Sequence, residues 1–181
     1  MRFRFNEEKT AQAAGHLLRL NGGRLNYMVL IKLLYLADRA MLMKHGQPIT
    51  GDAMVSMTNG PVLSRVLDLI NDGDRSGGPW VRHVSEPANY EVGLKETTET
   101  DELSAFELRL LEKVYAKFGK MDKWALVDWC HKNLAEWRDP NGSALPISPA
   151  DILRAVDRPE AEIDRVRRDA EEMWLIDTLV G

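Results

Sequence analysis

The sequence predicts a mainly α-helical fold, a compact domain of about seven helices with a small antiparallel β hairpin or sheet. Apolar residues recur three and four positions apart through several long stretches, which is the spacing of one helix face. Between these stretches lie short segments in which apolar and polar residues alternate, as is typical of strands. We expect a single domain over residues 1–181, with the β element at about 53–95 and C-terminal helices at about 148–180.

Three helices are predicted in the first part of the chain. The first covers residues 7–20 and ends at an Asn-Gly-Gly sequence. Asn26 can cap a second helix that runs to about residue 44, and its wide apolar stripe predicts a buried, central position. Pro61 suits the first position of a third helix, which ends at residues 71–74. The inward-facing residues of this third helix are expected to be Val62, Val66, Leu69 and Ile70.

The middle of the chain predicts the β element. Residues 80–84 and 90–94 each alternate apolar and polar side chains, and a turn-forming segment joins them. We expect these two segments to form a hairpin, with residues 54–57 as a third strand beside it.

The second half is predicted to be helical again. Residues 103–118 carry an apolar stripe after a capping box formed by Ser104 and Glu107. A fifth helix is marked by Trp124, Val127, Cys130, His131 and Leu134. Residues 140–143 form a turn, and residues 148–151 open a short sixth helix. The last helix starts near Pro159 and presents one apolar face, made of Ile163, Val166, Ala170, Met173 and Trp174.

The bulk composition narrows the class of protein. With 44% hydrophobic and 29% charged residues the chain can form a core. The net charge of -4 argues against nonspecific nucleic-acid binding, which needs a basic surface. A single cysteine, Cys130, cannot form an internal disulfide and fits a reducing cytoplasm. The N-terminus lacks a signal-peptide pattern, and the longest apolar run is interrupted by Lys32, so we expect a cytoplasmic protein with no membrane partner.

The segment from Lys32 to Val62 contains the most specific pattern. An apolar helix is followed by His-Gly-Gln-Pro-Ile-Thr-Gly-Asp at residues 45–52 and by Asn-Gly-Pro at residues 59–61. The glycines and prolines here restrict or extend the backbone angles, so the chain path is specified. This order of motifs resembles the Panacea domain, the family of SocA-like antitoxins.

A second, later segment supports the same resemblance. Residues 126–131, Leu-Val-Asp-Trp-Cys-His, are followed by Glu136 and Trp137, which is similar to the family's later helix with its histidine and tryptophan. The similarity covers most of the chain. It implies a bacterial or phage antitoxin that binds a protein toxin, and some relatives are expected to present the toxin to a Clp-type protease.

The resemblance and the polar residues around this corner together suggest a partner-binding site. Glycine- and proline-restricted loops can hold polar groups in place, so binding would lose little entropy in ordering them. The candidate residues are Asp38, Arg39, Asp52, Asn59, Pro61, His131 and Trp137. For Asp38, Arg39 and Asp52 an alternative stays open, in which they only hold the loop through hydrogen bonds and ion pairs.

The sequence gives little support for metal binding or catalysis. His45, Asp52 and His131 lack the spacing of a helical zinc site, and the adjacent Cys130 and His131 would point in different directions on a helix. His131 is expected to pack in the core with one hydrogen bond. We therefore expect no catalytic residue, no cofactor and no metal. Trp129 or Trp137 could be exposed at an interface, and Arg165, Arg167 and Arg168 could meet an acidic partner.

Three functions stay open at this point. The first is an antitoxin that neutralises its cognate toxin by direct binding, with or without a role as a proteolytic adaptor. The second is a DNA-binding autoregulator of its operon or a phage or mobile-element accessory protein, although the acidic composition argues against nucleic acid as a partner. The third is a hydrolase or nuclease built on Asp38, Asp52 and His131, which has no recognisable motif. The oligomeric state, including a homo-oligomer, is left open.

Overall fold

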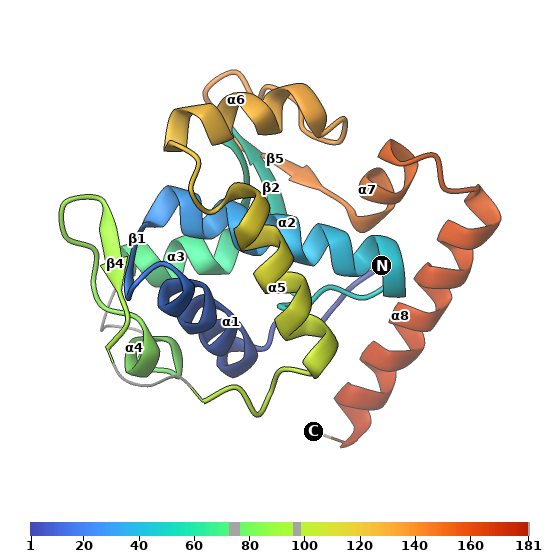
Figure 1. Ribbon diagram of the computed structural model, residues 1–181. Coiled ribbons are helices and arrows are strands. Elements are labelled where there is room, and N and C mark those ends of the chain that lie inside the picture. The colour runs from blue at the N-terminus through green and yellow to red at the C-terminus, as the bar shows by residue number, and fades with distance from the viewer. Residues whose placement is uncertain (73–76, 96–98, 181) are drawn as a thin grey trace.

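A computed structural model describes residues 1–72, 77–95 and 99–180 of the chain. These residues form eight helices and five short strands, arranged as in Figure 1. In chain order they are α1 (Glu7–Leu20), β1 (Arg24–Asn26), α2 (Tyr27–His45), β2 (Met54–Met57), β3 (Gly60–Leu63), α3 (Ser64–Asp72), α4 (Trp80–His83), β4 (Glu91–Gly93), α5 (Ala105–Phe118), α6 (Lys123–Asn133), β5 (Leu145–Ile147), α7 (Pro149–Ala155) and α8 (Glu160–Val180). The predicted mainly α fold with a minor β part is confirmed.

The long helix α2 runs through the middle of the molecule (Figure 1). Every residue from Val29 to Asp38 is buried, because α1, α3, α5, α6, α7 and strand β3 all pack around it. The side chain of Asn26 caps α2, as predicted, by accepting hydrogen bonds from the N–H groups of Met28 and Val29. The helix ends at Gly46, whose φ of 73° is readily adopted only without a side chain. The predicted central position of this helix is confirmed.

The other local signals also give the expected helices. Ser104 and Glu107 form the predicted capping box of α5, and Ser148 forms another with Asp151 at the start of α7. The stripe of α5 faces the core through Leu110, Leu111, Val114 and Phe118. Local capping and periodicity therefore placed most helix boundaries correctly.

The strands pair differently from the prediction. Strands β2 and β3 form a tight antiparallel hairpin, and β5 pairs with the other edge of β2. A separate two-stranded sheet joins β1 and β4, with Leu25 opposite Val92. Residues 54–57 are therefore a strand, as predicted, but they do not lie in the same sheet as β4.

Two segments were assigned wrongly from the sequence. Pro61 does not open a helix but lies in β3, and α3 starts three residues later. Residues Trp80–His83 form the short helix α4 instead of a strand. The predicted hairpin is reduced to two isolated bridges among the described residues, between Val84 and Leu94 and between Ala88 and Glu91. The indole of Trp80 is buried in the core, and the backbone N–H of Trp80 donates a hydrogen bond to the carboxylate of Glu7 in α1, so tertiary contacts override the alternating pattern. The predicted end of the third helix is found at Asp72, and residues 73–74 lie outside the described residues.

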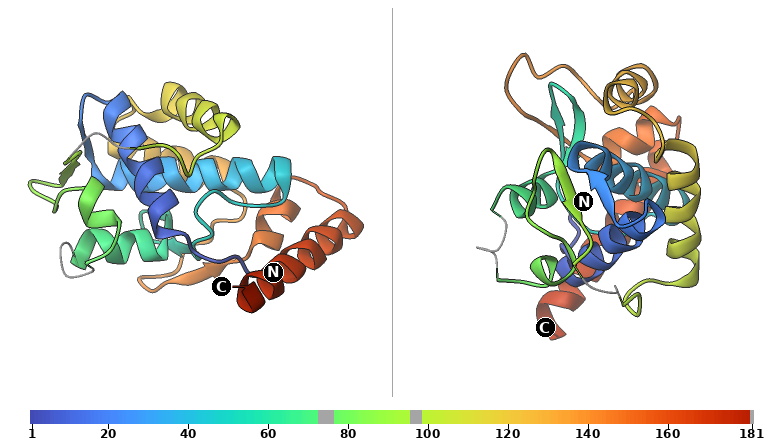
Figure 2. Two further views of the ribbon diagram at one scale, coloured as in Figure 1. Left: turned by 90° about the horizontal axis from the view of Figure 1, so that it is seen from below. Right: turned by 60° about the vertical axis from the view of Figure 1, so that its left-hand side comes forward.

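The last helix, α8, is packed along only half of its length. Ile163, Val166 and Ala170 are buried as predicted, whereas Met173 and Trp174 are substantially exposed. The N-terminal segment of the chain runs beside the C-terminal half of α8, as the left view of Figure 2 shows. Among the described residues, no helix combines the length and apolar character that crossing a bilayer requires.

The structure predicts a severe effect of a side chain at Gly51. Its φ is +70°, and an added Cβ would lie 2.1 Å from the carbonyl oxygen of Arg4. We expect Gly51→Ala to lower the free energy of unfolding by about 3 kcal/mol, measured by urea denaturation, because the N-terminal segment must move. Gly22→Ala is the matched control: its φ is +78° and its Cβ would meet no atom within 4 Å, so only the backbone term of about 1 kcal/mol is expected. Equal losses in both variants would contradict the close contact with Arg4.

Candidate functional site

The carboxylate of Asp38 holds the loop that follows α2. It is fully buried and accepts hydrogen bonds from the backbone N–H groups of Ile49 and Thr50, at 2.8 and 3.0 Å, and from the Thr50 hydroxyl. Burial raises the pKa of Asp38 to about 7, while the hydrogen bonds from Thr50 and Ile49 oppose this rise. Asp38 therefore has a structural role and has no surface to offer a partner.

Asp52 has a similar role at the end of the same loop, just before β2. Its two carboxylate oxygens accept hydrogen bonds from the N–H groups of Ala53, Arg65 and Val66, so it joins the loop to the first turn of α3. Burial raises the pKa of Asp52, and the backbone hydrogen bonds oppose the rise. For both aspartates the loop-holding alternative that the sequence left open is the one observed.

Arg39 belongs to a buried cluster that ties α2 to the loop after α6. Its Nε and Nη2 bind the two carboxylate oxygens of Glu136 at 2.6 and 3.2 Å. The hydroxyl of Tyr35, one turn earlier on α2, donates to Oε1 of Glu136 at 2.9 Å. Burial and the neighbouring Glu136 carboxylate raise the pKa of Tyr35, so its hydroxyl keeps its proton. The bidentate geometry makes this a strong link between segments almost 100 residues apart.

Trp137 and His131 lie together against the β2–β3 hairpin. Their rings are stacked, with centroids 3.9 Å apart and planes 20° apart. The indole N–H of Trp137 donates to the carbonyl of Met57 at 3.0 Å, which attaches the loop after α6 to the end of β2. The expected hydrogen bond of His131 is not observed, since its buried Nε2 has no partner among the described residues.

The seven predicted residues thus fall into two groups. Five lie around the hairpin and the loop after α6: Arg39, Asn59, Pro61, His131 and Trp137. Asp38 and Asp52 are linked to each other through the Thr50 hydroxyl on the other side of α2. Only Asn59 is well exposed, while Pro61 is buried and the rest are partly or fully covered. His45, suggested with Asp52 and His131 as a metal site, packs against Phe106 and does not join them.

A pocket of about 320 Å³ opens beside Asn59, between the start of α2, the hairpin and α3. Its walls are mainly apolar and comprise Tyr27, Met28, Ile31, Lys32, Met57, Thr58, Asn59, Gly60, Val62 and Leu67. Lys32 is 1% exposed, and its ammonium makes one long hydrogen bond, of 3.5 Å, to the carbonyl of Pro61. Burial lowers the pKa of Lys32 to about 8. The sequence interpretation did not identify this lysine, because its place on a buried helix face becomes meaningful only when the hairpin covers it.

An exposed aromatic cluster adjoins this pocket. Tyr90 and Trp124 are 66% and 53% exposed, and the ammonium of Lys123 lies 5.2 and 5.3 Å from their ring centroids. Tyr27, which lines the pocket, is 6.3 Å from Tyr90 between ring centroids. We call these four residues the aromatic face. Of Trp124, Trp129 and Trp137, the exposed residue is Trp124, whereas Trp129 and Trp137, considered from the sequence, are partly buried.

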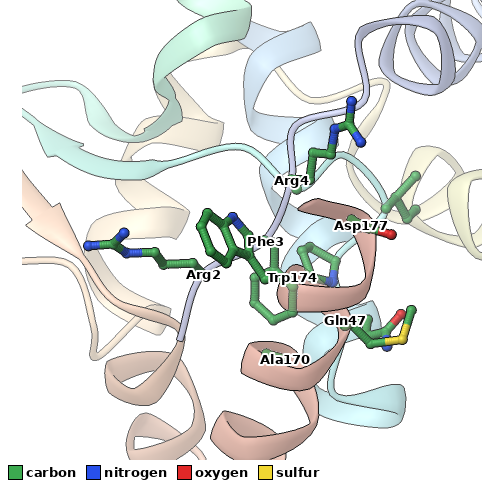
Figure 3. Close-up of a pocket in the computed structure, with 11 residues that line it drawn as sticks. Arg2, Phe3, Arg4, Gln47, Ala170, Trp174 and Asp177 are labelled. Atoms are coloured by element: carbon green, nitrogen blue, oxygen red, sulfur yellow. The ribbon is translucent and has the colours of Figure 1, made fainter. Parts of the chain in front are cut away.

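A second apolar surface lies at the C-terminal end of α8. Its exposed residues, here called the α8 end, are Met173, Trp174, Leu175, Ile176, Leu179 and Val180. A small pocket of about 120 Å³ separates it from the N-terminal segment and the loop after α2. Figure 3 shows Trp174 beside Phe3, with Arg2 and Arg4 extending away from the pair. The aromatic face and the α8 end lie at different ends of the molecule (Figures 1 and 2).

Comparison with known protein families shows to which family the chain is related. The family described as antitoxin SocA-like, Panacea domain, matches residues 30–138, which is more than half of the chain. The chain belongs to the SocA-like Panacea antitoxin family. The resemblance inferred from residues 32–62 and 126–137 is thereby confirmed. No curated protein and no solved structure matches the chain.

The residues matched by the Panacea family can be compared with the elements of the structure. The match covers α2 from Leu30 onward, the hairpin, and Tyr90, Lys123 and Trp124 of the aromatic face, while Tyr27 and Met28 of the pocket lining precede it. The α8 end lies outside the matched residues.

The burial of Lys32 predicts a pH-dependent stability effect. Its pKa in the folded state, about 8, is below the unfolded value of 10.5, so the unfolded state binds the proton more tightly. The contribution of Lys32 to stability is therefore greatest above pH 10.5 and is lost as the pH falls through 8. We expect Lys32→Met, which cannot be protonated, to raise the free energy of unfolding at pH 7 by about 2 kcal/mol, with a smaller gain at pH 10.

Denaturation by urea at the two pH values measures this difference. Lys113→Met on the exposed face of α5 is the matched control, for which we expect a change within about 0.5 kcal/mol at both pH values. A Lys32→Met variant that is destabilised equally at pH 7 and pH 10 would show that the ammonium is well solvated or paired.

Proposed function

We propose that this chain is an antitoxin that neutralises a protein toxin by binding it directly and without catalysis. Membership of the Panacea antitoxin family supports a toxin as the partner. The observation that carries the binding mode is the aromatic face, which presents two largely exposed aromatic rings next to an apolar pocket. Tyrosine and tryptophan in such positions dominate the energy of many protein interfaces.

The surroundings of the aromatic face favour binding without large rearrangement. The hairpin beside it is attached to α2 through Lys32 and to the loop after α6 through Trp137. Fixed elements of this kind lose little conformational entropy when a partner binds. We therefore place the toxin interface on the aromatic face, the pocket and Asn59, with Asp38 and Asp52 as supports of the scaffold.

Direct binding serves two modes of action. The antitoxin can block the toxin in a stable complex, or it can act as a proteolytic adaptor that presents the toxin to a Clp-type protease. Both modes need the same first contact and both belong to the cytoplasm, where the toxin and the protease would meet. The fate of the toxin after binding separates them.

Neutralisation is expected to be stoichiometric. Co-expression with the adjacent gene should restore the growth that the neighbour alone abolishes, and the two proteins should co-purify in a fixed ratio. The expected interface buries about 1,200–2,000 Å² in total, so hydrogen exchange should slow at the aromatic face and hairpin when toxin is added.

Toxin that disappears only when the Clp-type protease is present would identify the adaptor mode. Inactivation of excess toxin by substoichiometric protein, with a change in the toxin's mass, would contradict the proposal in favour of an enzyme.

The location of the interface is tested by a pair of exposed apolar residues. We expect Trp124→Ala to weaken toxin binding at least about tenfold, because an exposed tryptophan near a pocket is a typical centre of binding energy. Leu179→Ala at the α8 end, 84% exposed, is the matched control and should bind as the wild type does. Circular dichroism should show both variants folded, since neither side chain is buried. Loss of binding in Leu179→Ala alone would move the interface to the α8 end.

Trp137→Ala is a less direct test of the interface. Removing its indole also removes the hydrogen bond to Met57 and the stack on His131, which position the loop after α6. The same limitation holds for Asp52→Ala, because three backbone N–H groups would lose their acceptor.

A further inference from the structure

The ammonium of Lys32 is the least satisfied charged group in the described part of the core. It has three N–H donors, but its one hydrogen bond there is the 3.5 Å contact with the Pro61 carbonyl. It forms no ion pair within the described residues, although the lysine is almost completely buried. Buried charges are normally paired, so an unpaired one beside a pocket indicates a ligand of opposite charge.

The ammonium lies at the wall of the pocket, beside Gly60. A Cβ on Gly60 would approach Nζ of Lys32 to 3.2 Å, and both residues line the pocket. Gly60, with a φ of +94°, therefore places no side chain against the buried ammonium. A larger residue here would close the route between the pocket and Lys32.

The groups that face Lys32 carry no negative charge at neutral pH. From α6 the thiol of Cys130 approaches it, and burial raises the pKa of this thiol to about 11. From the hairpin it meets only the Gly60 backbone and the Pro61 carbonyl. On α2 the phenol of Tyr27 lines the same pocket, and from α3 only the apolar Leu67 reaches it. The pocket lining contains no acidic residue.

The remaining residues that line the pocket are mainly apolar and enclose a volume that suits one large amino-acid residue. Met28, Ile31, Met57, Val62 and Leu67 form most of the walls of a pocket of about 320 Å³. This volume is at the lower end of the range for ligand pockets, about 300–1,000 Å³, and suits a single large residue better than an extended segment. The complementary ligand has a carboxylate and an apolar group close to each other.

We propose that this pocket binds the C-terminal residue of the toxin, with its carboxylate on Lys32 and its apolar side chain among Met28, Met57 and Leu67. The C-terminal residue of a chain carries a carboxylate and a side chain on the same Cα, which matches the close arrangement of ammonium and apolar wall. An internal aspartate or glutamate carries its carboxylate on the side chain itself and would leave the apolar walls to a neighbouring residue. Capture of a terminal carboxylate is an established mode of peptide recognition.

This proposal rests on the proposed function only for the identity of the ligand, so small probes test the pocket without toxin. N-acetyl-leucine reproduces a C-terminal apolar residue, N-acetyl-leucinamide lacks the charge, and N-acetylglycine lacks the side chain. An N-acetylglutamate α-amide, whose α-carboxyl is blocked and whose side-chain carboxylate is free, reproduces an internal acid. Binding is measured from amide chemical shifts of residues 57–62 in labelled protein.

We expect N-acetyl-leucine to bind at pH 6.5 at least tenfold more tightly than each of the other three probes. This binding should decrease as the pH rises through about 8, where Lys32 loses its proton while the probe stays ionised. Lys32→Met should abolish the preference for the acid over the amide, and Lys113→Met should leave it unchanged.

Equal binding of the acid and the amide, no binding of N-acetyl-leucine up to about 50 mM, or an unchanged preference in Lys32→Met would each overturn the proposal. Tighter binding of the blocked glutamate would also overturn it, in favour of an internal acidic residue.

With the toxin in hand, deletion of its last residue should weaken the complex with the wild type but not with Lys32→Met. If N-acetyl-leucine binds as expected and the neighbouring toxin is nevertheless not neutralised, the proposed function fails and the pocket remains. If neutralisation is intact and the probes do not bind, only the pocket proposal fails.

Discussion

The rest of the structure depends on the need to satisfy polar groups on a completely buried helix. Helix α2 is surrounded on all sides, and yet Lys32, Tyr35 and Asp38 lie in its buried part. A polar group in an apolar interior is costly unless it finds a partner. Since the backbone of α2 is already bonded within the helix, these side chains need partners from other segments. Each of them meets a different part of the chain.

These contacts position the surface loops of the molecule. Asp38 binds the loop at residues 49–50, Tyr35 binds Glu136 in the loop after α6, and Lys32 reaches the carbonyl of Pro61 in the hairpin. The three contacts differ in quality. Asp38 and Tyr35 make short hydrogen bonds, whereas Lys32 makes one long hydrogen bond and keeps two donors without an acceptor in the described part of the chain. The well-satisfied groups support the scaffold, and the poorly satisfied group lies where a ligand could complete it.

The family motif holds the scaffold and shapes the pocket within one segment. Most of the polar residues in residues 32–62 are used to hold the chain path, as Asp38 and Asp52 show. The same chain path creates a pocket and places it beside the exposed rings of Tyr90, just before β4, and Trp124 of α6, both outside that motif. A family pattern of this kind can accompany different partners, because the buried contacts do not depend on the residues that line the exposed surface.

The sequence by itself determined most of the helices and the family. The caps at Asn26, Ser104 and Ser148 and the apolar stripes act over three or four residues, so they can be recognised without knowing the rest of the fold. Strand pairing and exposure were decided only by the tertiary structure. Strands of three or four residues have weak intrinsic preferences and form where a partner is brought to them, as β1 is to β4 across more than sixty residues. Likewise, Trp124 is exposed and Trp137 partly covered because of elements distant in sequence, and Lys32 acquires an unusual environment only when the hairpin covers it.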